Sequence, residues 1–225
     1  MRPAYPPAAV EWLTRRLDLR PGRRVLDLGA GTGKLTRQLA ATGADVVAVE
    51  PGAPMLAQLR AALPNVEALV GAAEAIPLPD ASVDAVTAGQ AYHWFDPDRA
   101  LPELHRVLRP GGGLGLVWNW WDVRDPLQQR IVELTSGVAA LSDDAEERAP
   151  DSRFFTDLEH EHFEWEAQTS PDALVARLAT TSFLLTSADD QRDAILGEVR
   201  ELAGERGPRF ALTQVTDAYV CFRRG

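Results

Sequence analysis

A glycine-rich segment, Asp27-Leu28-Gly29-Ala30-Gly31-Thr32-Gly33, most limits what this chain can fold into. It follows Arg24–Leu28, whose apolar residues predict a strand, and precedes Lys34–Ala41, which predicts a helix. Glycines in such a turn permit positive φ angles and let the backbone approach a ligand closely. The first turn of the following helix adds unpaired N–H groups and the positive end of the helix dipole. The segment therefore predicts a strand–turn–helix unit that binds a ligand.

Strands and helices alternate through the first half of the chain. Predicted strands cover Asp45–Val49, Val66–Val70, Val83–Ala88 and Leu114–Trp118, and predicted helices cover Pro54–Leu63 and Pro97–Leu108. A further helix is predicted near the N-terminus, where Val10, Leu13 and Leu17 recur at helical spacing. Strand–helix–strand units at this spacing predict an α/β fold with a doubly wound, mostly parallel sheet.

The pattern changes after Asp122. The remaining segments predict a helix, an acidic loop, a strand, two helices and a strand, over Pro126–Leu141, Ser142–Ser152, Asp157–Gln168, Pro171–Ala179, Ala188–Ala203 and Phe210–Phe222. The long connection between the last two strands allows antiparallel pairing at the edge of the sheet. We expect one structural domain with a Rossmann-like core over residues 1–122, and residues 123–225 that complete a seven-stranded sheet and add a helical lid.

Composition excludes several classes of function. The 225 residues include 23 Lys+Arg and 33 Asp+Glu, a formal net charge of −10, which disfavours binding to nucleic acid and to anionic membranes. Cys221 is the only cysteine, so no intrachain disulfide can form. The sequence has no apolar stretch of about 18 residues that could span a bilayer, and its first residues lack the apolar core of a signal peptide. We expect a cytoplasmic protein whose partner is a small molecule.

The spacing within the glycine-rich segment separates three classes of ligand. A dinucleotide fingerprint needs glycine where Lys34, the only lysine, stands. A phosphate-binding P-loop needs glycine in place of Leu28 and Ser or Thr in place of Leu35. What remains is an acidic turn with Glu50 at the end of the next strand, where a carboxylate can accept both hydroxyls of a ribose. Asp27 would face a cationic group or hold the amides of the turn. S-adenosylmethionine, which has a ribose and a positive charge but no phosphate, fits this pattern.

The sequence resembles the class I S-adenosylmethionine-dependent methyltransferases, in particular the small-molecule branch called methyltransferase type 11. The resemblance is strong from Val25 to Asn119 and rests on five segments in the family's order. These are the glycine-rich segment, Val49-Glu50-Pro51 with Met55, Gly71–Pro77, Asp84–Gln90 and Leu108–Gly112. The resemblance implies S-adenosyl-L-methionine as cofactor and S-adenosyl-L-homocysteine as product. The cofactor-binding residues that it implies are Asp27, Gly29, Ala30, Gly31, Gly33, Glu50, Pro51, Met55, Ala73, Glu74 and Gln90.

Aromatic and polar residues follow the fourth and fifth predicted strands, at the edge where an open parallel sheet binds its ligand. Aromatic faces stabilise a sulfonium and stack on a flat acceptor. We expect an acceptor pocket lined by Tyr5, Tyr92, Trp94, Asn119, Trp120 and Trp121. His93 is the candidate catalytic residue, as a base for an acceptor that must lose a proton, with a hydrogen-bonded rim histidine that shapes the pocket as the alternative. We expect no metal site, since His160 and His162 lack a third ligand at the usual spacing.

The expected reaction is methyl transfer to O, N or C of a small-molecule acceptor by in-line displacement. Two alternatives stay open: a catalytically silent S-adenosylmethionine-binding protein that acts in an assembly, and an NAD-dependent oxidoreductase, which Lys34 disfavours. The chain starts at Arg2–Pro6, a segment that in the family normally follows another helix, one that helps to close over the cofactor. A naturally short chain, a misassigned start codon, or a partner subunit in a homodimer would each account for this.

Overall fold

The computed structural model describes residues 4–135 and 150–225. The chain divides into two compact units. We call one the core unit, whose described residues are 4–119, 150–163 and 216–225. We call the other the helical unit, whose described residues are 120–135 and 164–215.

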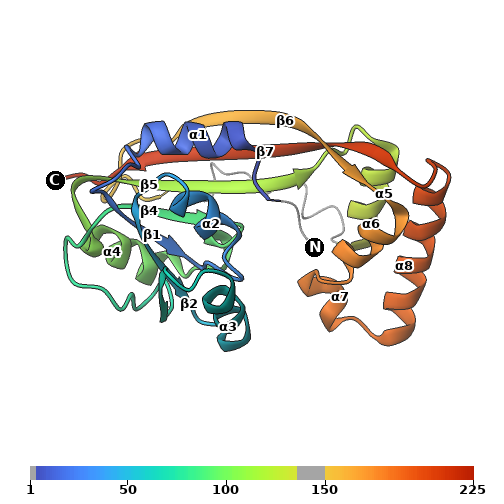
Figure 1. Ribbon diagram of the computed structural model, residues 1–225, viewed down its shortest axis with the longest axis horizontal. Helices are drawn as coiled ribbons and strands as arrows, with labels where there is room; N and C mark the ends of the chain where they lie inside the picture. The colour runs from blue at the N-terminus through green and yellow to red at the C-terminus, as the bar shows by residue number, and fades with distance from the viewer. Residues whose placement is uncertain (1–3, 136–149) are drawn as a thin grey trace. The chain divides into compact units, whose positions relative to one another are not determined.

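The strands form a seven-stranded sheet in the order β3-β2-β1-β4-β5-β7-β6 (Figure 1). β1 pairs in parallel with β2 and β4, and β3 and β5 extend the parallel part. The arrow of β7 points opposite to those of β5 and β6, so the sheet ends in antiparallel pairing, which confirms the predicted sheet. The bounds are β1 Arg24–Leu28, β2 Asp45–Glu50, β3 Glu67–Val70, β4 Val83–Gly89, β5 Leu108–Trp121, β6 Glu159–Thr169 and β7 Phe210–Phe222.

The helices follow the predicted alternation in the core unit. They are α1 Pro7–Arg16, α2 Lys34–Ala40, α3 Ala53–Ala62, the short 3-10 helix η1 Tyr92–Trp94, and α4 Pro97–Val107. The helical unit contains α5 Pro126–Thr135, α6 Pro171–Leu178, α7 Ser182–Thr186 and α8 Asp189–Gly204. α7 was not predicted from the sequence. The predicted end of the helix at Leu141 and residues 142–149 of the predicted acidic loop lie outside the described residues.

Close packing of α1 on β5 depends on two glycines of that strand. A Cβ at Gly113 would lie 2.5 Å from Leu17 Cδ2, and one at Gly115 would lie 2.8 Å from Leu17 Cδ1. Leu13 and Leu17, one helical turn apart, are both buried in the apolar cluster under α1. Each buried leucine contributes roughly 1.5–3 kcal/mol through the hydrophobic effect. The glycines therefore anchor the N-terminal helix on the sheet.

The start of β5 differs from the expectation. The sequence predicts a turn over Leu108–Gly112 and a strand from Leu114. In the structure the strand begins at Leu108, and its register with β4 shifts between Val83 and Ala85. Gly111 has a φ of 75°, a conformation that glycine adopts without strain. The expected turn is thus an irregularity within the strand, because a bulge absorbs extra residues without ending the pairing.

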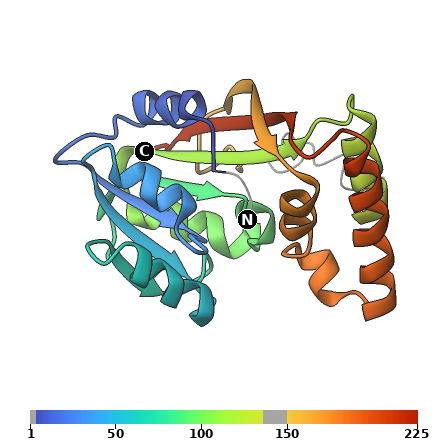
Figure 2. The same cartoon turned by 45° about the vertical axis from the view of Figure 1, so that its right-hand side comes forward.

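The helical unit has an apolar core of its own. α8 packs against α5 and α6, as Figure 2 shows. Fully buried residues at this contact come from each of the three helices, including Ile131, Leu178 and Val199. Within the described part of the chain, no helix is both long and apolar enough to cross a membrane.

Candidate functional site

The glycine-rich turn joins β1 to α2 through three residues with positive φ. Gly29, Gly31 and Gly33 have φ angles of 69°, 57° and 85°. The amides of Gly29 and Ala30 both donate to the carbonyl of Val49, at 2.9 and 3.1 Å, so the turn is tied to the end of β2. A Cβ at Gly31 would meet nothing within 4 Å. The backbone at Gly31 therefore borders open space that a ligand could fill.

Glu50, the last residue of β2, connects this turn to the start of α3. Its Oε2 accepts from the Gly31 amide and its Oε1 from the Gly52 amide, each at 2.8 Å, and the residue is only 3% exposed. A carboxylate oxygen accepts more than one hydrogen bond. Glu50 is thus held in one orientation and keeps the capacity to accept the hydroxyls of a ribose. Of the two predicted neighbours of Glu50, Pro51 is exposed and Met55 is 43% exposed in the first turn of α3.

Asp27 is buried beneath the glycine-rich turn. Its Oδ2 accepts from Thr36 Oγ1 at 2.5 Å. Its Oδ1 is also buried and has no hydrogen-bond partner among the residues that the structure describes. Burial, which disfavours the charged form, raises the pKa of Asp27 to about 7 although the Thr36 hydrogen bond opposes the shift. A buried oxygen that lacks a hydrogen-bond donor can accept a hydrogen bond from a cationic group of a ligand.

The fourth strand ends at Gly89 and Gln90. Gln90 has a φ of 54°, uncommon for a non-glycine residue, and is held by its amide, which donates to Val117, and by its Nε2, which donates to the Asn119 carbonyl. A Cβ at Gly89 would lie 2.5 Å from the hydroxyl oxygen of Tyr5, which is 7% exposed. Gln90, Asn119 and Tyr5 therefore lie around the exit of β4.

The segment around Ala73 and Glu74 is fixed by α4. Ala73 is buried, and Glu74 Oε1 accepts from the Asp96 amide at 2.9 Å. Arg106 donates to the carbonyls of Ile76 and Leu78, at 3.0 and 2.8 Å. Sequence reasoning missed Arg106, since no motif marks a helix residue that binds the backbone of a segment about 30 positions away.

Glu103, on the same helix, completes this arrangement. It accepts from the Ile76 amide at 2.9 Å and pairs with Arg106. The Arg106 hydrogen bonds lower the pKa of Glu103, which therefore stays ionised at neutral pH. The two side chains bind both the amide and the carbonyl of Ile76, so the course of the backbone after Glu74 is determined by α4.

The aromatic residues after β4 have different surroundings. Tyr92 is 6% exposed and makes edge contacts with Phe95 and Trp118, and burial raises its pKa. Trp94 is 71% exposed, with its ring centroid 5.0 Å from that of the partly buried His93. His93 Nδ1 lies 3.3 Å from Trp118 Nε1. Trp94 thus offers an open aromatic surface, whereas Tyr92 packs within the fold.

The remaining predicted pocket residues belong to different units. Asn119 is in the core unit, where its Oδ1 accepts from Thr216 Oγ1 at 2.6 Å. Trp120 and Trp121 are in the helical unit. The guanidinium of Arg177 lies 3.9 Å from the centre of a Trp121 ring and also donates to Gln214. Trp121 is therefore part of a cation–π pair that no sequence pattern predicted.

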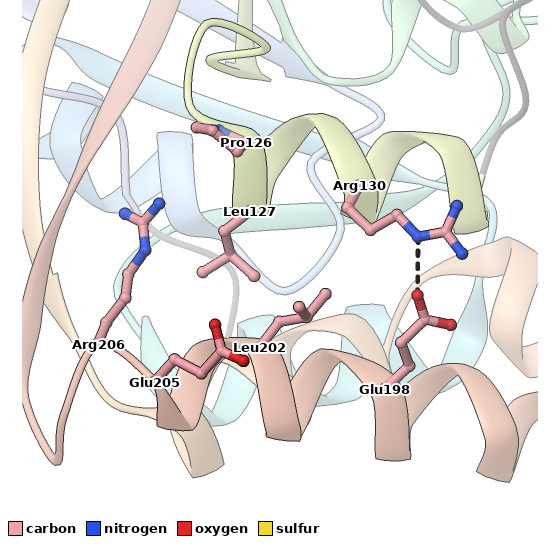
Figure 3. A pocket seen from close by; sticks show the side chains of 7 residues that line it. All are labelled: Pro126, Leu127, Arg130, Glu198, Leu202, Glu205 and Arg206. Atoms are coloured by element: carbon pink, nitrogen blue, oxygen red, sulfur yellow. Dashed lines mark hydrogen bonds and ion pairs between the residues drawn. The ribbon is translucent and has the colours of Figure 1, made fainter.

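A metal-binding cluster and a cavity are the other two kinds of candidate site. In the described residues, no group of three His, Cys, Asp or Glu is arranged to hold a metal ion. A cavity of about 450 Å³ lies in the helical unit between α5 and α8 (Figure 3). Its charged residues are paired at least in part, with Arg130 2.7 Å from Glu198 and Arg206 2.6 Å from Asp125. None of the predicted site residues lines this cavity.

Comparisons with known proteins identify a family of methyltransferases. The family described as "Methyltransferase domain" matches residues 26–116. An uncharacterized methyltransferase from Mycobacterium tuberculosis is 48% identical over 201 residues, which cover 89% of this chain and 80% of the relative. A demethylmenaquinone methyltransferase from Thermus thermophilus is 33% identical and covers 78% of this chain and 82% of the relative.

A solved structure shares the fold. It is a putative type II methyltransferase from Anaeromyxobacter dehalogenans, 31% identical, with a TM-score of 0.72 over 100% of this chain and 98% of that one. The match extends through both units, beyond the segments on which the resemblance rested. The chain belongs to the class I S-adenosylmethionine-dependent methyltransferase family.

Proposed function

We propose that the protein transfers a methyl group from S-adenosylmethionine to an O, N or C atom of a small-molecule acceptor by in-line displacement. When bound, S-adenosylmethionine supplies a methyl carbon on a sulfonium: the acceptor's lone pair forms a bond to that carbon while the C–S bond breaks and leaves its electron pair on sulfur. A small acceptor is supported by the relative named for demethylmenaquinone and by the net charge of −10, which disfavours nucleic acid.

The proposal rests mainly on one observation: two carboxylates, Glu50 and Asp27, lie on either side of the same glycine-rich turn. Glu50 is oriented by the amides of Gly31 and Gly52, and would hold the ribose hydroxyls. Asp27 keeps the buried Oδ1 without a partner in the described structure, and would interact with the ammonium group of the methionine part. Glycine at position 31 leaves the space above the turn open. These residues fit S-adenosylmethionine in charge and in hydrogen-bonding capacity.

The protein's own contribution to the reaction is to bind and orient. Ala73 and Glu74, held through Ile76 by α4, would border the adenine. Gln90 and Tyr5 at the exit of β4 would border the methionine part, with the strained backbone at Gln90 fixing its direction. Trp94 offers its exposed ring to the acceptor. Orientation of this kind supplies much of the rate enhancement in a direct displacement.

The test has two steps. Calorimetric titration with S-adenosylmethionine, S-adenosylhomocysteine and NAD should show binding of the first two only. Incubation with methyl-tritiated S-adenosylmethionine and a panel of carboxylates, phenols, amines and quinols should then label an acceptor. Binding without labelling of any acceptor would favour the catalytically silent alternative, and absence of binding would refute the proposal.

A further inference from the structure

The hydroxyl of Thr36 is directed at one of the two carboxylate oxygens of Asp27. Thr36 lies in the first turn of α2 and is fully buried, and its Oγ1 donates to Asp27 Oδ2 at 2.5 Å. A hydroxyl group has a single hydrogen to donate. Thr36 therefore binds Oδ2 and leaves the other oxygen, Oδ1, to a different partner.

The neighbours of Asp27 in the sheet do not supply a donor for Oδ1. Asp27 of β1 lies beside Ala48 of β2 and Thr87 of β4. Ala48 has no polar side chain, and the Thr87 hydroxyl donates to the Leu26 carbonyl at 3.3 Å. Within the part of the chain that the structure describes, Oδ1 is buried and has no hydrogen-bond partner. Buried polar oxygens in proteins are nearly always hydrogen-bonded, so we expect a group from outside the chain to supply the donor.

The position of Asp27 along β1 indicates which group this is. Asp27 is the last residue but one of the strand, directly before the glycine-rich turn to which the proposed function assigns the cofactor. A Cβ at Gly31 of this turn would meet nothing within 4 Å, and open parallel sheets bind ligands at this end of their strands. The ammonium of the methionine part is a cation that donates hydrogen bonds, so it matches a buried carboxylate oxygen.

The hydrogen bond from Thr36 also decides which oxygen of Asp27 carries a proton. Burial raises the pKa of Asp27 to about 7, hydrogen bonding from Thr36 opposes the rise, and the charge of Glu50 at the end of β2 adds to it. In a protonated carboxyl group the carbonyl oxygen is the better acceptor. Because Oδ2 accepts from Thr36, the proton resides on Oδ1. The ammonium group needs the same atom as its acceptor, so the proton and the ligand exclude each other there.

We propose that Thr36 is a positioning residue for the cofactor: it holds Asp27 Oδ2, so that the ammonium group of the ligand and a proton compete for Oδ1, and binding at neutral pH releases that proton to water. The inference rests on the proposed function for the identity of the ligand. The Oδ1–H bond is the bond that breaks, and the ammonium group keeps its own hydrogens. Methylthioadenosine has the adenosyl part of the ligand without an ammonium group, so its binding releases no proton from Asp27.

The first experiment counts protons in the wild type. Calorimetric titration at pH 7 in two buffers of different ionisation enthalpy gives the number of protons that a ligand releases. With a pKa of about 7, half of the Asp27 carboxyl groups carry a proton at pH 7. We therefore expect about half a proton released per S-adenosylhomocysteine bound, and close to none per methylthioadenosine. Equal release by both ligands, or release by neither, would overturn the inference.

The second experiment removes the hydroxyl of Thr36. Thr36→Val keeps the shape of the side chain and loses its hydrogen bond, which raises the pKa of Asp27 further. Thr36→Val should therefore release close to one proton per S-adenosylhomocysteine and bind it about tenfold more weakly at pH 7. Its affinity for methylthioadenosine should not change, and Thr36→Ser should restore both wild-type values. Thr42→Val, which removes the hydroxyl that donates to the Leu39 carbonyl after α2, is the matched control and should behave as the wild type.

A purely structural role of Thr36 gives a different result. Equal weakening of both ligands in Thr36→Val, or an unchanged proton count, would assign Thr36 to the fold alone and overturn the inference. Thr36→Ala removes the same hydroxyl with less bulk and replaces Thr36→Val in these measurements if that variant does not fold.

Failure of the inference and failure of the proposed function are distinguishable. Absence of S-adenosylmethionine and S-adenosylhomocysteine binding to the wild type would refute the proposed function. Binding of S-adenosylhomocysteine without release of a proton would leave the proposed function intact and refute the role of Thr36 alone.

Discussion

Thr36 donates its hydroxyl to Asp27 Oδ2 across 2.5 Å, and neither residue is more than 1% exposed. This bond satisfies one oxygen of the carboxylate. The other, Oδ1, has no partner in the described part of the chain. Because burial outweighs the hydrogen bonding from Thr36, the pKa of Asp27 rises from 3.8 to about 7. Asp27 therefore changes its charge in the range of pH in which enzymes work.

The first prediction concerns stability. The unfolded chain loses the Asp27 proton near pH 3.8 and the folded chain near pH 7, so the folded state binds more protons between these values. The contribution of Asp27 to the free energy of unfolding therefore falls as the pH rises from about 4 to about 7, by an amount on the order of a few kcal/mol. Urea unfolding at pH 5 and pH 7.5 should show this loss in the wild type and not in Asp27→Asn. An equal loss in both proteins would contradict the assignment.

The second prediction concerns cofactor affinity. A cationic group beside Asp27 favours the ionised carboxylate. Affinity for S-adenosylmethionine should therefore rise by up to about tenfold per pH unit below pH 7 and level off above it. Calorimetry should find a flat dependence and weaker binding at pH 7.5 for Asp27→Asn. If both proteins gave the same pH slope, Asp27 would not be the group that pairs with the cofactor.

Glu50 is the subject of the third prediction. Glu50→Ala removes the acceptor for the Gly31 and Gly52 amides together with the expected ribose contact. Hydrogen bonds to a charged group are worth about 1.5–3 kcal/mol, so affinity for S-adenosylhomocysteine should fall about 10- to 100-fold. Glu50→Gln, which keeps one accepting oxygen, should fall less. The exposed Glu67 offers a control, since Glu67→Gln should leave affinity unchanged. Wild-type affinity in Glu50→Ala would exclude the ribose role.

The fourth prediction distinguishes two effects of an added Cβ, which are loss of space for the ligand and strain in the backbone. Gly22 and Gly31 both have positive φ and nothing within 4 Å of an added Cβ, but only Gly31 lies in the glycine-rich turn. Gly22→Ala and Gly31→Ala should both cost about 1–2 kcal/mol in stability. Only Gly31→Ala should weaken S-adenosylhomocysteine binding, by about tenfold or more. Thermal unfolding and calorimetry measure the two effects, and equal affinities in both variants would mean that the space above Gly31 is not used.

The sequence predicted much of the fold because most elements carry local signals. Phe210–Phe222 alternates in polarity and matches β7 in its bounds, and the glycine-rich turn marks β1 and α2. α7 was missed because five residues between polar, threonine-rich neighbours give too short a periodic pattern. β5 begins earlier than predicted because a bulge keeps Leu108 paired with Val83.

Contacts between side chains that lie far apart in the chain could not be predicted from the sequence. Glu50 and Asp27 were predicted to bind the cofactor because of their positions near the glycines of the turn. Their roles in cofactor binding stay predictions until binding is measured. That Trp118 donates to His93 depends on the register of β5 beside β4, and no local pattern in either segment encodes it. Arg106 was missed for the same reason, since its partners lie about 30 residues upstream.

Arg106 supplies the last prediction. Arg106→Gln removes the hydrogen bonds to the Ile76 and Leu78 carbonyls and the ion pairs with Glu103 and Asp80. We expect a loss of about 1–3 kcal/mol in unfolding free energy and a weaker affinity for S-adenosylhomocysteine, because the backbone after Glu74 is released. Arg130→Gln, on the exposed face of α5, is the control and should cost no more than about 1 kcal/mol without changing affinity. Calorimetric unfolding and titration of both variants decide the matter: destabilisation of Arg106→Gln with wild-type affinity would assign Arg106 to the fold alone.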